Sequence, residues 1–96
     1  MRYILLMQKN ELTRLRQQID IVDRAIIASL GRRKKVERAI GTYKRKHGMK
    51  LLDMKRRNSV LKTRVAEGRK KGVQPQLVRK LFKLIHQYSL SVQKNT

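Results

Sequence analysis

The 96-residue chain has no cysteine, one proline, no tryptophan, three tyrosines and one phenylalanine. Without cysteine, disulfides and thiolate metal sites are excluded. Few aromatics beside plentiful Leu, Ile and Val indicate helices and give little sign of a sheet. No apolar run is long enough to cross a bilayer, and the short run after Met1 lacks the cleavage site of a signal peptide. We therefore expect an all-α, cytoplasmic protein with no membrane partner.

Acidic residues are also scarce: six Asp and Glu stand against 26 Lys and Arg, which gives a formal net charge of +20. Such a surface attracts polyanions. The cations are spread over every segment, however, and they lack the interleaved aromatics typical of single-strand binders. We expect nucleic acid to bind non-specifically, if at all.

The pattern of caps and breakers predicts three helices in one domain covering residues 1–96. The first helix is expected after the N-cap Asn10, with residues 1–10 as an N-terminal extension, and it should run to about Lys46 before Gly48. Asp53 can cap a second helix that ends near residue 69. After a turn at residues 70–73, Pro75 stands at the first position of a third helix.

A long apolar stripe follows the first predicted helix, with alternating spacings of three and four residues. Its members are Leu12, Leu15, Ile19, Val22, Ile26, Val36, Ile40 and Tyr43. The predicted helix would be about 55 Å long, whereas a compact domain of about 100 residues has a radius of gyration of only about 13 Å. One subunit cannot cover that stripe, so we expect three-helix subunits intertwined in a helical-bundle homodimer.

The stripe is interrupted where Ser29 and Arg33 take core positions, and Lys44 follows Arg33 by eleven residues, or three helical turns. A cation on a face meant for burial is costly unless something pairs with it. We expect no acidic residue to do so, and infer that the missing partner is an anionic ligand.

Further polar groups are predicted to face inward from the other helices. Arg56 shares the inner face of the second helix with Val60, Leu61, Arg64 and Val65, while Ser89 and Gln93 extend the apolar line of the third. Together with Arg33 and Lys44 they indicate a polar pocket inside a bundle. No nucleophile–base pair, metal-ligand cluster or phosphate loop occurs, so we expect neither metal nor cofactor.

In this register the chain resembles the all-α chorismate mutase family, from about Leu12 to Gln93. The matching residues are Leu15, Arg16, Ile19 and Asp23, then Arg33, Gly41 and Lys44, then Asp53 and Arg56, and finally Ser89 and Gln93. The resemblance implies a homodimer of three-helix subunits that converts chorismate to prephenate by a Claisen rearrangement, on the route to phenylalanine and tyrosine.

The resemblance also implies roles for single residues. Arg16 resembles the arginine that reaches into the partner subunit's site, and Arg33 resembles the one that grips a substrate carboxylate. Lys44 and Gln93 are similar to the donors that contact the ether oxygen of the breaking bond. The other substrate contacts implied are Asp53, near the substrate hydroxyl, with Arg56 and Ser89.

The chemistry of this rearrangement suits the residues that are present. A pericyclic reaction needs no nucleophile, general base or metal, only a flexible dianion held in a compact conformation. Negative charge grows on the ether oxygen as its bond to carbon lengthens, so fixed cationic donors stabilise that state selectively.

One position departs from the family pattern, because Arg57 stands where the family usually has a glutamate that accepts from the substrate hydroxyl. Recognition of that hydroxyl could fall to Asp53 alone, or the enzyme could be slow or use another substrate. Two alternatives stay open: an isochorismate pyruvate lyase, which forms salicylate, and a catalytically weak basic helical dimer that binds nucleic acid.

Overall fold

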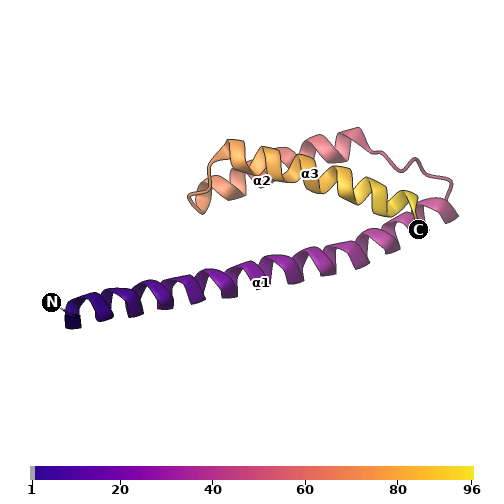
Figure 1. Ribbon diagram of the computed structural model, residues 1–96. Coiled ribbons are helices and arrows are strands. Elements are labelled where there is room, and N and C mark those ends of the chain that lie inside the picture. Colours follow the sequence, from indigo (N-terminus) through magenta and orange to yellow (C-terminus); the bar gives the residue numbers. More distant parts are fainter. Residues whose placement is uncertain (1) are drawn as a thin grey trace. The chain divides into compact units, whose positions relative to one another are not determined.

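The computed structural model describes residues 2–96 and contains three helices (Figure 1): α1 (Arg2–Lys46), α2 (Met54–Lys70) and α3 (Pro75–Lys94). No strand occurs within residues 2–96. The predicted all-α fold, with a long, a short and a medium helix, is confirmed. None of these helices combines the length and the apolar character needed to cross a bilayer.

The predicted start of the first helix is wrong, because α1 begins at Arg2 and not after Asn10. An N-cap residue starts a helix only where the preceding residues leave the helical conformation. Residues 2–9 contain no glycine or proline and are rich in Leu, Met, Gln and Lys, which are strong helix formers. The helix therefore continues through Asn10 and reaches 45 residues.

α1 and α2 both end at a glycine with positive φ, as predicted for Gly48. At the end of α1, Met49 N–H donates to the Lys44 carbonyl (2.8 Å) and Gly48 has φ 61°. At the end of α2, Val73 N–H donates to the Gly68 carbonyl (2.8 Å) and Gly72 has φ 74°. These six-to-one hydrogen bonds define Schellman motifs, in which glycine adopts the left-handed conformation without a Cβ penalty.

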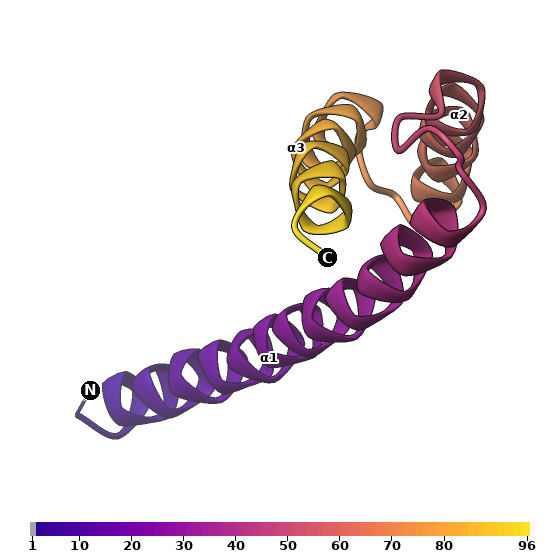
Figure 2. The ribbon, with the colours of Figure 1, turned by 90° about the vertical axis from the view of Figure 1, so that its right-hand side faces the viewer.

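Two compact units make up the chain, Met1–Arg33 and Lys34–Thr96. In the first unit the predicted stripe is exposed within a single chain, at Leu12, Leu15, Ile19, Val22 and Ile26. The second unit contains the end of α1 together with α2 and α3, which lie side by side in Figures 1 and 2 and make extensive mutual contacts.

The interior of the second unit is small. Its buried apolar residues are Val60 and Val65 of α2 and Val78 of α3. The two valines of α2 were predicted to face inward, and Leu61 and Arg64 are half-buried as well. Arg56 is an exception: it is exposed, and the neighbouring Arg57 is half-buried instead. In the first turn of α2 the inward position is therefore Arg57, one residue later than predicted.

Gly41 brings the end of α1 against the end of α3 within the second unit. A Cβ at this buried glycine would lie 2.9 Å from the Gln93 carbonyl oxygen and 3.0 Å from Gln93 Cα. Nearby, the Arg45 guanidinium donates to the Lys94 carbonyl (2.9 Å). Gly41 therefore allows the ends of α1 and α3 to approach closely.

We predict that Gly41→Ala lowers the free energy of unfolding by about 1–3 kcal/mol, because backbone atoms of Gln93 have to move to admit the methyl group. Urea denaturation followed by circular dichroism measures the change. Gly31→Ala is the matched control, since nothing lies within 4 Å of its Cβ and it lies opposite the apolar stripe on α1. The control should gain about 0.5–1 kcal/mol from helix propensity. Equal stability of both variants would contradict the close packing at Gly41.

Candidate active site

Lys44 is the cation around which the second unit's polar site is arranged. It lies in the last turn of α1, where the helix dipole favours positive charge. Its half-buried ammonium donates to the Leu51 carbonyl at 2.6 Å and to Gln93 Oε1 at 2.9 Å. The carbonyl belongs to the loop between α1 and α2. Lys44 therefore ties together the end of α1, this loop and α3.

Ser89 and Gln93 supply the buried polar groups of α3. They are 6% and 8% exposed, less than most of the apolar residues of the same helix. Their spacing of four residues sets them on one face of α3, as predicted. Gln93 contacts α1 twice, since its Oε1 accepts from Lys44 and its Nε2 donates to the Glu37 carboxylate.

Glu37 corrects the expectation that no acid would accompany the inward cations. This residue is 9% exposed, and Gln93 links it to Lys44. The sequence carried a usable signal, because Glu37 follows Arg33 by four residues and precedes Gly41 by four. Side chains with that spacing are neighbours on a helix surface. Glu37 itself lies outside the apolar positions of the stripe, so the stripe alone does not predict its burial.

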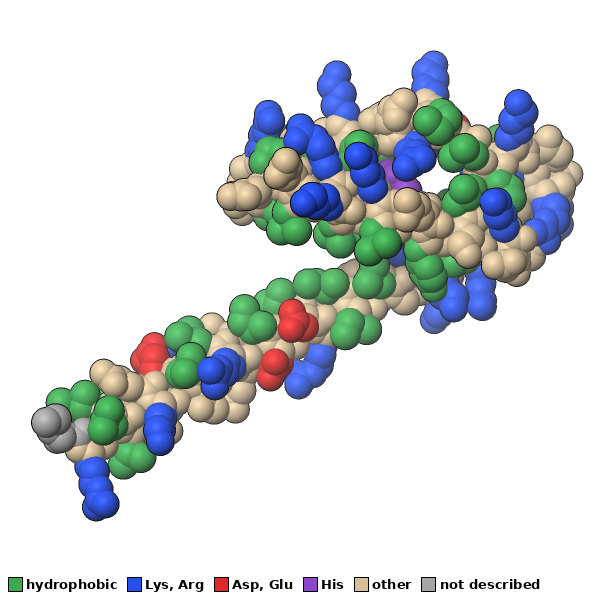
Figure 3. All heavy atoms as spheres, turned by 45° about the horizontal axis from the view of Figure 1, so that its top comes forward, with side chains coloured by type: hydrophobic (Ala, Val, Ile, Leu, Met, Phe, Trp, Pro, Cys, Tyr) green, Lys and Arg blue, Asp and Glu red, His purple; other side chains and the backbone are tan. Residues whose placement is uncertain are grey.

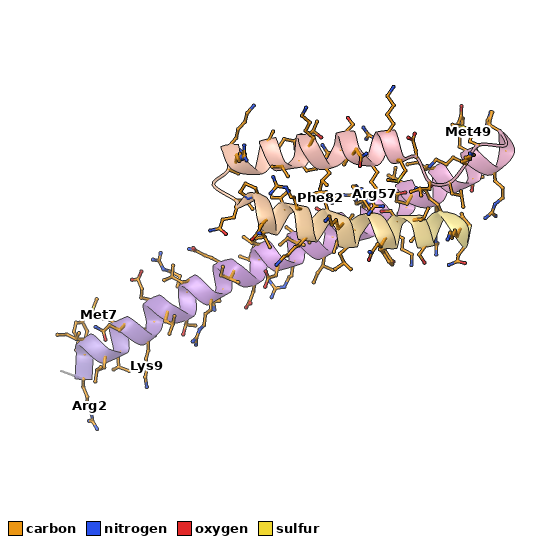
Figure 4. All side chains as sticks on the ribbon, turned by 90° about the horizontal axis from the view of Figure 1, so that it is seen from above. Arg2, Met7, Lys9, Met49, Arg57 and Phe82 are labelled. Atoms are coloured by element: carbon orange, nitrogen blue, oxygen red, sulfur yellow. The ribbon has the colours of Figure 1, made fainter. Side chains whose placement is uncertain are left out.

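The beginning of α2 places three of the predicted residues. Asp53 is the N-cap, as expected, and its Oδ1 accepts from the Arg56 backbone N–H at 2.9 Å. The Arg56 side chain is exposed. Arg57 is half-buried and lies on the side of α2 that faces α3 in Figure 4. The arginine that departs from the family pattern is thus the one directed toward the interior.

The two remaining predicted residues, Arg16 and Arg33, belong to the first unit. Arg16 is exposed and Arg33 is half-buried. None of the hydrogen bonds given above for Lys44 and Gln93 involves them. The described contacts therefore bring together Lys44, Gln93 and Glu37, and they leave the placement of both arginines in a common site as a prediction.

The Lys44–Gln93 pair is suited to hold an anionic oxygen. An ammonium has three donors and an amide nitrogen has two, so each group can donate to a ligand while it keeps the bonds described above. Residues 2–96 contain no cluster of His, Asp and Glu that could hold a metal ion. The site thus offers fixed hydrogen-bond donors and positive charge.

The fold and this donor pair define a small all-helical protein with a polar site between the ends of its helices. Residues 15–94 match the family model of chorismate mutase type II, so the chain belongs to the chorismate mutase type II family. The chain is also similar to the T-protein of Enterobacter agglomerans, at 33% identity over 75 residues. That stretch covers 78% of this chain but only 20% of the T-protein, so the chain corresponds to about a fifth of that relative.

The cap at Asp53 leads to a prediction about stability. Asp53→Ala removes the acceptor for the Arg56 N–H and should lower the free energy of unfolding by about 1 kcal/mol. Asp53→Asn keeps an acceptor at the cap and should lose less than the Ala variant. Urea denaturation of both variants measures the difference, and an Ala variant as stable as wild type would show that the cap contributes nothing.

Proposed function

We propose that this protein is a chorismate mutase that converts chorismate to prephenate, in the biosynthesis of phenylalanine and tyrosine, without metal or cofactor. Family membership supports the reaction class. The single observation that carries the proposal is the partly buried hydrogen bond between Lys44 and Gln93, which sets two groups with spare donors side by side. These are the residues that the family resemblance assigns to the ether oxygen.

The proposed mechanism is electrostatic and conformational. Chorismate carries two carboxylates, and cationic groups that hold them keep the flexible molecule in its reactive, compact conformation. As the carbon–oxygen bond lengthens, negative charge grows on the ether oxygen next to Lys44 and Gln93. Donors that are already in place stabilise that charge more than they stabilise the substrate, which lowers the barrier.

Several substrate contacts enter the proposal through the family resemblance alone. They are those of Arg16 from the partner subunit, Arg33 with a substrate carboxylate, Arg56 and Ser89 with other polar groups, and Asp53 with the hydroxyl. Burial of Ser89 and the position of Asp53 at the N-terminus of α2 are compatible with these roles. Arg56, in contrast, is exposed, and the inward residue at the start of α2 is Arg57, which stands where the family has a glutamate that accepts from the substrate hydroxyl.

The basic surface supports an anionic substrate in a general way. Lys and Arg side chains project from the part of the chain that contains α2 and α3 (Figure 3). The only acidic residues after Lys34 are Glu37, Asp53 and Glu67. A field of one sign raises the association rate of small anions, and it also attracts nucleic acid non-specifically.

We further propose an intertwined homodimer. Apolar side chains are exposed in a single chain along α1, at Leu12, Leu15, Ile19, Val22 and Ile26. An apolar face of that length on a lone helix has to be covered for the helix to be stable in water. A second copy of the same helix is the simplest cover, and the family resemblance then places Arg16 in the partner's site.

The first prediction on activity concerns Lys44. Lys44→Ala should lower kcat by about 10²–10³-fold, because one donor to the developing oxyanion is lost. Lys46→Ala removes the same charge from an exposed position on the same helix and should stay within twofold of wild type. Chorismate consumption with product identification measures both. Wild-type dimer that leaves chorismate unchanged over hours would refute the proposed function.

The same assay, run with isochorismate, separates the mutase from a pyruvate lyase. The inward Arg57 is the reason to test the lyase reaction, because this arginine replaces the glutamate expected beside the substrate hydroxyl. We expect no salicylate fluorescence. Salicylate formed faster than prephenate would assign the lyase reaction to this site.

The predicted sharing of Arg16 can be tested by complementation. Arg16→Ala and Lys44→Ala proteins should each be nearly inactive. If they are unfolded together and refolded, half of the dimers are mixed, and each mixed dimer has one complete site. The mixture should then recover about a quarter of wild-type activity. A mixture no more active than its components would contradict a site shared between subunits.

A further inference from the structure

Glu37 is the one acidic residue of this basic chain that is buried. The other five, at positions 11, 20, 23, 53 and 67, are exposed. Burial of a carboxylate is costly unless it is hydrogen-bonded. One of its partners is the side-chain amide of Gln93, which donates to it and is itself buried and hydrogen-bonded to Lys44. Neither the composition nor the resemblance assigns any function to Glu37.

The order Glu37, Gln93, Lys44 admits only one orientation of the Gln93 amide. An ionised carboxylate accepts and cannot donate, whereas an ammonium donates and cannot accept. The amide must therefore turn its nitrogen to Glu37 and its oxygen to Lys44, as the two hydrogen bonds show. If the amide were rotated by 180°, oxygen would face oxygen at Glu37 and nitrogen would face nitrogen at Lys44.

This orientation decides what Gln93 can offer a bound molecule. With its nitrogen held by Glu37, one N–H is used and the second remains to donate. Lys44 likewise uses two of its three donors on the Leu51 carbonyl and Gln93 Oε1, and keeps the third. A free amide could instead present its oxygen to the substrate, which would repel the developing negative charge on an ether oxygen.

We propose that Glu37 is a positioning residue for the rearrangement: its carboxylate holds Gln93 in the orientation in which the amide donates to the ether oxygen. This inference rests on the proposed function. In this role Glu37 acts through Gln93. Its loss should therefore lower kcat, which reports transition-state stabilisation, with little change in KM.

Three substitutions at Glu37 separate this role from packing. Glu37→Met keeps the approximate length but removes the acceptor, and it should lower kcat by about 10–100-fold while KM changes less than threefold. Glu37→Gln keeps an acceptor without charge, and it should restore most of the lost kcat. Glu37→Asp withdraws the acceptor by one methylene and should lie between them, which gives a second measurement if the Met variant does not fold.

A double-mutant cycle and an amide spectrum complete the test. In a Gln93→Ala background, Glu37→Met should change kcat by less than twofold, because the group through which Glu37 acts is gone. The side-chain NH2 resonance of Gln93, identified by its absence in Gln93→Ala, should shift in Glu37→Met and much less in Glu37→Gln. This signal does not depend on turnover.

The outcomes distinguish the two levels of the proposal. An active wild-type enzyme whose Glu37→Met variant keeps its kcat overturns the positioning role and leaves the proposed function intact. Wild-type protein without mutase activity overturns the proposed function and any catalytic role of Glu37. An unshifted Gln93 amide signal in Glu37→Met overturns the contact itself, whatever the activity.

Discussion

The hydrogen bond from Lys44 to Gln93 joins residues 49 positions apart in the chain and depends on the close approach of α1 and α3 at Gly41. A side chain at Gly41 would collide with the Gln93 backbone and separate the two donors. The close helix contact and the donor pair are therefore adjacent: Gly41, which lets α1 approach α3, lies about one helical turn before Lys44, which donates to Gln93.

The loop between α1 and α2 belongs to the same arrangement. Gly48 ends α1 in a Schellman motif, Asp53 starts α2 as its N-cap, and the Leu51 carbonyl between them accepts from Lys44. The ammonium is thus held from two sides before any substrate arrives. Donors that are fixed in advance need no reorganisation when charge develops on a reacting oxygen, and such preorganisation is how electrostatic catalysis lowers a barrier.

Most of the fold could be predicted from local signals, and the errors arose where such signals compete or are absent. Gly48, Asp53 and Pro75 gave helix boundaries because glycine, a capping carboxylate and proline act on the backbone directly. The predicted helix start after Asn10 was wrong because no residue before Asn10 stops a helix. Ser89, Gln93 and Lys44 stood out as polar interruptions of apolar faces. Glu37 was not predicted: its spacing of four from Arg33 and Gly41 places it on the same helix surface, but its partner Gln93 lies on another helix.

The central claim is that Lys44 and Gln93 together receive the ether oxygen of a dianion, and a crystal structure of the dimer with a bicyclic dicarboxylate mimic of the rearranging substrate tests it most directly. The account predicts the bridging ether oxygen within about 2.7–3.1 Å of Lys44 Nζ and Gln93 Nε2, with Gln93 still bonded to Glu37. A mimic bound only to exposed cations, with the Lys44–Gln93 pair unoccupied or Lys44 extended into solvent, would contradict it.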